Sequence, residues 1–263
     1  MLRHFRHPYH IVSISPWPIL IAFTLLSILI GAMVVVVTVA VAVASTAAVA
    51  ILILLSFIWF NNVVKESSGG FHLIRVHRGL MVGFLLFLLS EIMLFVSFFW
   101  AFFHSSLSPV VELYEIWPPI GIHAVNPWAI PLLGSCVLLA SGFVLTLALP
   151  LSLTDNTRGT ALLSLLITVL LGLLFIIMQF NEYCYGEFTI ADSVIGSVFY
   201  MTTGLHAIHV IVGVLFLATG LFRVSIDSFT TEHHLGLELA IFYWHLVDVV
   251  WLMVFIIFYW WVS

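Results

Sequence analysis

A carboxylate stands in the middle of a long apolar stretch of this chain. Glu91 lies within LMVGFLLFLLSEIMLFVSFFWAFF, residues 80–103, which as a helix is about 36 Å long and can cross a bilayer. A charge near the centre of the hydrocarbon costs about 2.5 kcal/mol or more, so such groups usually face a bundle interior, a partner or a water-filled cavity. Glu91 could therefore carry protons or, when neutral, donate a hydrogen bond between helices. A position facing lipid is the least expected.

Two histidines share one face of another apolar stretch. His206 and His209 are three residues apart, and Thr202 and Gly213 continue the same face of a helix. Two imidazoles could begin a metal site, but the chain arranges no further histidine or cysteine set for a haem or copper centre. We expect a buried polar stripe that forms hydrogen bonds between helices. The sequence thus predicts no metal site and no catalytic residue in the chain.

The last apolar stretch carries a second polar face. Its members are His234, Glu238, His245 and Asp248, whose spacing places them along one side of a helix. They could form a proton relay. A network of hydrogen bonds and ion pairs between helices is favoured, because buried polar groups need partners in either case. Glu182, near the end of an earlier stretch, is a candidate neighbour.

The composition indicates where these groups must lie. Hydrophobic residues make up 63% of the 263 residues and charged residues 7%, and the mean hydropathy is +1.25. The chain has too few polar residues to cover the surface of a soluble globular protein. We therefore predict an all-α polytopic membrane protein with no nucleic-acid-binding surface. Seven spans are predicted, at about 17–38, 42–65, 73–105, 129–152, 157–184, 191–223 and 234–261.

The first apolar run is long enough for two crossings. Residues 19–64 carry no charge and would be about 69 Å long as one helix, which is too long for a single crossing. Thr38, or Ser45 with Thr46, supplies the only polar candidates for the reversal. The run is therefore predicted to turn at one of these two places.

The loop charges test the seven-span count independently. With seven spans every basic residue falls on one side: Arg3, Arg6, Lys65, Arg75, Arg78, Arg158 and Arg223. The opposite loops carry acids and no base: Glu112, Glu115, Glu187 and Asp192. The positive-inside rule then places the N-terminus on the cytoplasmic side or its organellar equivalent. Cys136 and Cys184 lie far apart in sequence, and we expect no disulfide.

Several long and irregular motifs resemble one family. They are HPYHIVSISPWP (7–18), SEIMLFVSFFWAFFHSSLSP (90–109), WPPIGI (117–122), NPWAIPLL (126–133), FTIADSVIGSVFYMTTGLHAIHVIVG (188–213) and HHLGLELAIFYWHLVDVVWLMVFIIFYWW (233–261). In this order, and over the whole chain, the sequence is similar to cytochrome c oxidase subunit III.

The resemblance implies an architecture and a role. The family fold is a single membrane domain, here residues 1–263, with two helices in 1–66, five in 67–263 and a cleft between them that holds phospholipids. The subunit would pack beside subunit I, which carries the haems and copper, together with subunit II and accessory subunits. It would have no redox cofactor of its own. It would support electron transfer from cytochrome c to oxygen, coupled to proton pumping, by stabilising subunit I and assisting proton or oxygen supply.

The resemblance also assigns positions and a location. Glu91 matches a buried, protonatable carboxylate near the lipid cleft and a proposed oxygen path. Candidate lipid contacts are Trp59, Lys65, Glu66, His72 and Arg223. The chain departs from the family pattern at some positions, for example at Phe60, Asn61 and Asn62, which follow Trp59. The expected location is the mitochondrial inner membrane, multi-pass with the N-terminus in the matrix, or alternatively a bacterial plasma membrane.

Two rival functions remain open from the sequence. A subunit III of a quinol oxidase would belong to the same class. A stand-alone proton-coupled transporter that uses Glu91, Glu182 and Asp248 would belong to another class. The transporter would be expected to show internal repeats and broken half-helices around a midplane site, and the sequence shows neither.

Overall fold

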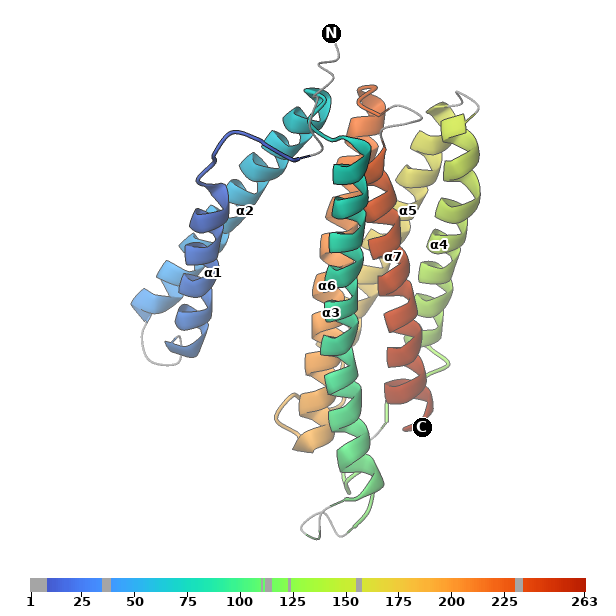
Figure 1. Ribbon diagram of the computed structural model, residues 1–263. Coiled ribbons are helices and arrows are strands. Elements are labelled where there is room, and N and C mark those ends of the chain that lie inside the picture. Colours follow the sequence, from blue (N-terminus) through green and yellow to red (C-terminus); the bar gives the residue numbers. More distant parts are fainter. Residues whose placement is uncertain are drawn as a thin grey trace. The chain divides into compact units, whose positions relative to one another are not determined.

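The computed structural model describes residues 9–34, 39–109, 111, 115–122, 124–154, 158–229 and 234–263, with backbone alone at 32–34, 39–44, 147–154 and 158. Within these ranges the regular elements are helices and no strand occurs. The helices are α1 (Trp17–Val34), α2 (Val39–Ser68), α3 (Ile74–Leu107), α4 (Ile130–Thr154), α5 (Arg158–Cys184), α6 (Ser193–Ser225) and α7 (Leu235–Val254), which continues into the π-helical η2 (Phe255–Trp260) (Figure 1).

The helices lie where the apolar runs predicted them, and one of the two candidate reversals is excluded. Ser45 and Thr46 are not at a reversal, since both lie inside α2, which begins at Val39. Thr38, the other candidate, lies outside the described residues. Five described helical stretches are long and apolar enough to cross a membrane: Ser45–Ser68, Ile74–Leu107, Gly159–Cys184, Ser193–Ser225 and Leu235–Trp260. Trp17–Gly31 and Ile130–Thr146 are shorter apolar helices.

The chain forms two compact units, and the first is Met1–Leu80. In it α1 packs against α2, and a Cβ added at Gly31 would lie 3.1 Å from Cβ of Ser45. Helix α2 ends in a Schellman motif around Gly70, whose φ of +80° favours glycine. The Phe71 N–H donates to the Glu66 carbonyl at 3.1 Å, and the Gly70 N–H donates to Ser67 at 3.1 Å. This turn folds the chain after α2 back beside its last turn.

The second unit, Met81–Ser263, is a helical bundle. Each of α4 to α7 packs against the next, and α7 also contacts α4, so these four helices enclose a core (Figure 1). Two tryptophans of α7 are fully buried and donate their indole N–H to serines of α4: Trp244 to Ser141 at 2.9 Å and Trp251 to Ser135 at 3.0 Å. A buried indole needs such a partner, and these bonds fix the register of α7 on α4.

Helix α3 joins the bundle mainly through long side chains. Phe84 contacts Phe216 of α6 with ring centroids 6.2 Å apart, and Phe102 contacts Phe258 of η2 at 4.7 Å. Phe102 also meets Trp117 of the following loop edge to face at 5.7 Å. The inward-facing side of α3 is therefore the side that carries Glu91.

Two glycines let α5 and α6 approach the Trp244 ring. A Cβ added at Gly172 of α5 would lie 2.7 Å from Cη2 of Trp244 and 2.7 Å from Cγ2 of Val214. At Gly213 of α6 it would lie 3.0 Å from Cε3 of the same ring. Small residues at such crossings allow close packing between membrane helices, so the indole of Trp244 is held between two glycines.

Helix α7 changes its winding at its end. From Phe255 to Trp260 the backbone is π-helical, and the Trp261 N–H donates to the Ile256 carbonyl, five residues earlier, at 2.9 Å. This segment buries Phe258 and Tyr259. Short π segments of this kind are rare and often occur at functional sites.

Candidate functional site

Glu91 pairs with a histidine of the neighbouring helix. Its Oε2 atom lies 2.8 Å from Nε2 of His209, which joins α3 to α6 across the interior of the second unit. The side chains of the pair are 20% and 11% exposed, so both are largely removed from the surroundings. In the structure the carboxyl group of Glu91 thus faces His209.

The hydrogen bonds of His209 indicate where the protons of the Glu91–His209 pair lie. Its Nδ1 atom lies 2.8 Å from the Leu205 carbonyl oxygen, and because a carbonyl oxygen can only accept, Nδ1 carries a hydrogen. Nε2 then either accepts a hydrogen bond from neutral Glu91 or, as part of an imidazolium, donates one to the carboxylate. In both states one proton lies between Glu91 and His209. The geometry can thus hold a proton at this point and move it between two atoms.

Aromatic rings surround this proton-sharing pair. Phe95 meets the His209 ring edge to face with centroids 5.1 Å apart, and Tyr243 of α7 lies nearly parallel to it at 6.3 Å. Phe95 and Tyr243 are themselves buried. These rings limit the rotation of the imidazole and reduce the polarity around it, which strengthens the hydrogen bond to Glu91.

His206 turns away from this pair. Its Nε2 donates to the Val247 carbonyl of α7 at 3.2 Å, and its ring lies against Trp251 at 5.1 Å and Phe175 at 5.8 Å. His206 is completely buried. His206 therefore bonds to α7 and His209 to α3, and the two rings do not converge on a common point.

Glu182 belongs to a separate cluster of hydroxyl groups. It accepts a hydrogen bond from the Tyr259 hydroxyl of η2 at 2.7 Å. The next residue, Tyr183, bonds through its hydroxyl to Oγ1 of Thr203 at 2.6 Å. Thr203 in turn donates to the Phe199 carbonyl at 2.8 Å, so Tyr183 must be the donor to Thr203. This cluster ties the end of α5 to α6 and η2.

The polar face of α7 separates into local contacts. Nε2 of His234 lies 2.9 Å from Oε1 of Glu238. His245 bonds to Oγ1 of Thr146 in α4 at 3.1 Å. Asp248 lies against Gly142, where an added Cβ would be 2.5 Å from its Oδ2. Glu238, His245 and Asp248 thus lie on α7, and His234 precedes the helix as its N-cap. The hydrogen bonds given above do not join these four residues into a continuous chain.

The candidate lipid residues occur in both units. In the first unit Trp59 stacks on Phe60 with centroids 6.3 Å apart, and Lys65 is exposed at the end of α2. In the second unit the Arg223 guanidinium lies 4.1 Å from the centroid of the Phe229 ring. The charged end of Arg223 thus packs on an aromatic ring in a cation–π contact.

Glu66 and His72 meet a residue that the sequence analysis missed. Both lie close to His10 of the segment before α1. No spacing in the sequence signals this approach, because it depends on the turn around Gly70 and on the path of the chain before α1.

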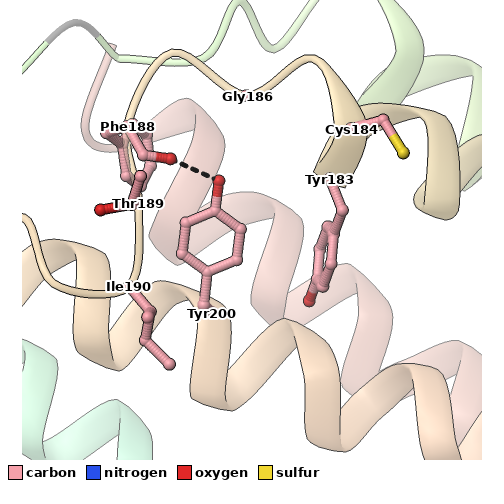
Figure 2. A pocket seen from close by; sticks show the side chains of 7 residues that line it. All are labelled: Tyr183, Cys184, Gly186, Phe188, Thr189, Ile190 and Tyr200. Atoms are coloured by element: carbon pink, nitrogen blue, oxygen red, sulfur yellow. Dashed lines mark hydrogen bonds between the residues drawn. The ribbon is translucent and has the colours of Figure 1, made fainter.

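A pocket of about 510 Å³ opens at the loop between α5 and α6. Its lining residues are Tyr183, Cys184, Gly186, Phe188, Thr189, Ile190 and Tyr200 (Figure 2). The Tyr200 hydroxyl donates to the Phe188 carbonyl at 2.7 Å (Figure 2). The backbone N–H and the hydroxyl of Thr189 both donate hydrogen bonds to the Asp192 carboxylate. These bonds, the backbone one most, lower the pKa of Asp192. The loop is thus held by its own hydrogen bonds. The stabilisation that the Asp192 carboxylate gives the loop is lost as the pH falls through that lowered pKa.

Comparison with known proteins identifies the family. The family model for cytochrome c oxidase subunit III matches residues 7–263. Cytochrome c oxidase subunit 3 of Prototheca wickerhamii is 45% identical over 258 residues, which cover 97% of this chain and 98% of the relative. The protein of the same name from Aedes aegypti is 45% identical over 262 residues, 99% of each chain, and that from Yarrowia lipolytica is 43% identical over 263 residues, 99% of this chain and 98% of the relative. This chain therefore belongs to the cytochrome c oxidase subunit III family.

Proposed function

We propose that this chain is a non-redox core subunit of cytochrome c oxidase that stabilises subunit I, binds phospholipid and assists proton or oxygen supply. Membership of the family makes it a component of an oxidoreductase complex. The named relatives are eukaryotic, which favours the mitochondrial inner membrane over a bacterial membrane. The gathering of basic residues on one side favours a matrix N-terminus.

The observation that carries the finer role is the Glu91–His209 pair. It places a shared proton between two helices inside an apolar bundle, where an ionisable group is costly unless it has a partner. A group of this kind can hold helices together, and it can also accept and release a proton. We therefore assign the pair a structural and modulatory role beside the redox subunits.

Removing this chain from the assembled oxidase tests the supporting role. The haem spectrum and the first turnovers should stay intact, because electrons pass through the haems and copper of the partner subunits. Activity should then decline faster during turnover. Proton uptake should slow at higher pH, because the surface of the oxidase that takes up protons has lost the neighbouring groups of this chain. Stopped-flow oxygen reduction and turnover counting, with the reconstituted complex as control, measure both effects. Loss of the haem signal or of the first turnovers would contradict the proposal.

Replacing both His206 and His209 with glutamine tests the non-redox assignment. The iron and copper content per complex should not change, because the two imidazoles bond to different helices and offer no common set of ligands. Elemental analysis normalised to subunit I measures the content, and the wild-type complex purified in parallel is the control. A stoichiometric loss of copper or iron from a fully assembled complex would show that the histidines hold a metal.

A further inference from the structure

Three potential metal ligands converge at the end of α2. His10 comes from the segment before α1, Glu66 from the last turn of α2, and His72 from the connection to α3. Each offers one ligand atom, and the three atoms all lie within 4.8 Å of one another. All three residues belong to the first compact unit, so their approach is set by the fold of that unit.

The turn after α2 accounts for two of the three positions. Because Gly70 reverses the chain in a Schellman motif, Phe71 bonds back to the Glu66 carbonyl and His72 follows directly beside it. His10 approaches from a distant part of the sequence, and its ring meets that of His72 at 64° with centroids 5.6 Å apart. The inclined rings are not stacked, so their nitrogen edges can face one point.

The spacing of the ligand atoms is close to that around a small divalent ion. His10 Nε2 and Glu66 Oε2 are 4.0 Å apart, which is too long for a hydrogen bond. Ligands about 2.0–2.1 Å from a tetrahedral zinc ion stand about 3.3–3.5 Å from one another. A contraction of less than about 1 Å, within the range of side-chain rotations, would bring the two atoms to that distance.

The chemistry of the three groups selects the kind of ligand. Two neutral imidazoles and one carboxylate carry a net negative charge, which attracts a cation and repels a phosphate. Imidazole nitrogen suits zinc and similar transition metals, whereas calcium and magnesium prefer sites made of oxygen. Three protein ligands leave a fourth tetrahedral position for water, and the partial exposure of His10 (36%) and Glu66 (26%) gives water access to it.

We propose that His10, Glu66 and His72 form a binding site for a zinc-type divalent cation on the aqueous side of the α2–α3 connection. Bound metal would tie the segment before α1 to the end of α2 and would reduce the freedom of both.

Zinc titration of the intact oxidase tests the site. The purified complex is stripped with a chelator and titrated with zinc chloride against a fluorescent zinc indicator, with haem as the measure of complex. The wild type should bind one zinc ion more than the variants His10→Gln and His72→Gln, or the variants should bind that ion at least about tenfold more weakly. Loss of a group that only hydrogen-bonds to a metal ligand already lowers metal affinity by about that factor. His104→Gln is the matched control, because His104 is exposed on α3 and stacks on Trp100.

A spectroscopic measurement keeps the test decisive if a variant fails to assemble. Zinc X-ray absorption of the wild-type complex at one equivalent should show scattering from two imidazoles, together with oxygen at the distances of a zinc site. Haem content and subunit composition report assembly. Equal zinc stoichiometry and affinity in wild type, His10→Gln and His72→Gln would overturn the proposal. A zinc spectrum without imidazole scattering would overturn it as well.

Discussion

Replacing Gly172 with alanine should destabilise the second unit by about 1–3 kcal/mol, the usual cost of an extra group in a filled core. The added Cβ would lie 2.7 Å from both Trp244 and Val214, well inside van der Waals contact. The indole cannot shift easily, because it is bonded to Ser141 and lies against Gly213 on α6. The strain therefore falls on the packing of α5 against α6 and α7.

The thermal midpoint for release or unfolding of the subunit in the purified oxidase measures this effect. Gly83→Ala on α3 is the matched control, since no described atom lies within 4 Å of its added Cβ. Alanine there should be neutral or stabilising by about 0.5–1 kcal/mol, because it lowers the entropy lost by a helical glycine. Equal midpoints for the two variants would show that the close approach at Gly172 is not a constraint.

Replacing Glu91 with leucine should also destabilise the second unit. His209 Nε2 would lose its partner in a mostly buried position, at a cost of about 1–3 kcal/mol. Glu91→Gln should cost much less, because the amide can still donate a hydrogen bond to Nε2, although it cannot titrate. The glutamine variant should therefore assemble normally and show a milder form of the turnover defect expected after removal of the chain.

A double-mutant cycle separates the pair from its surroundings. Because both changes remove the same interaction, Glu91→Leu with His209→Leu should cost less than the sum of the single changes. Subunit retention and the thermal midpoint of the purified complex provide the energies. Ser90→Ala is the neighbouring control, since Ser90 is exposed and bonds only within its own helix turn in the contacts observed. Strictly additive energies would mean that the two side chains do not interact.

The positions of the helices were predictable because long apolar runs fix them. There is a physical reason why Ser45 and Thr46 mark no reversal: a hydroxyl in an apolar helix can bond to a carbonyl one turn earlier and so need not end the helix. Thr24 and Ser27 of α1 do this, bonding to Ile21 at 2.9 Å and to Phe23 at 2.8 Å. Polar residues of this type are therefore weak markers of a reversal within a membrane helix.

The partners within the candidate site were less accessible to prediction. The mid-depth position of Glu91 follows from the sequence, but its bond to His209 depends on how α3 packs against α6 through phenylalanine side chains. The same limit applies to His10, whose approach to Glu66 depends on a turn and on a segment far away in sequence. Helical spacing orders residues along one helix, and it does not specify which helix lies opposite.

The π-helical winding of η2 sets the direction of the side chains that follow α7. Each residue of an α-helix advances the side-chain direction by about 100°, and a π-helical turn accommodates one residue more than an α-helical turn before its hydrogen bond closes. If the same residues were wound as an α-helix, Tyr259 would be turned away from Glu182 by about the angle of one residue. The contact between α5 and η2 therefore depends on the winding of this segment as well as on its residues.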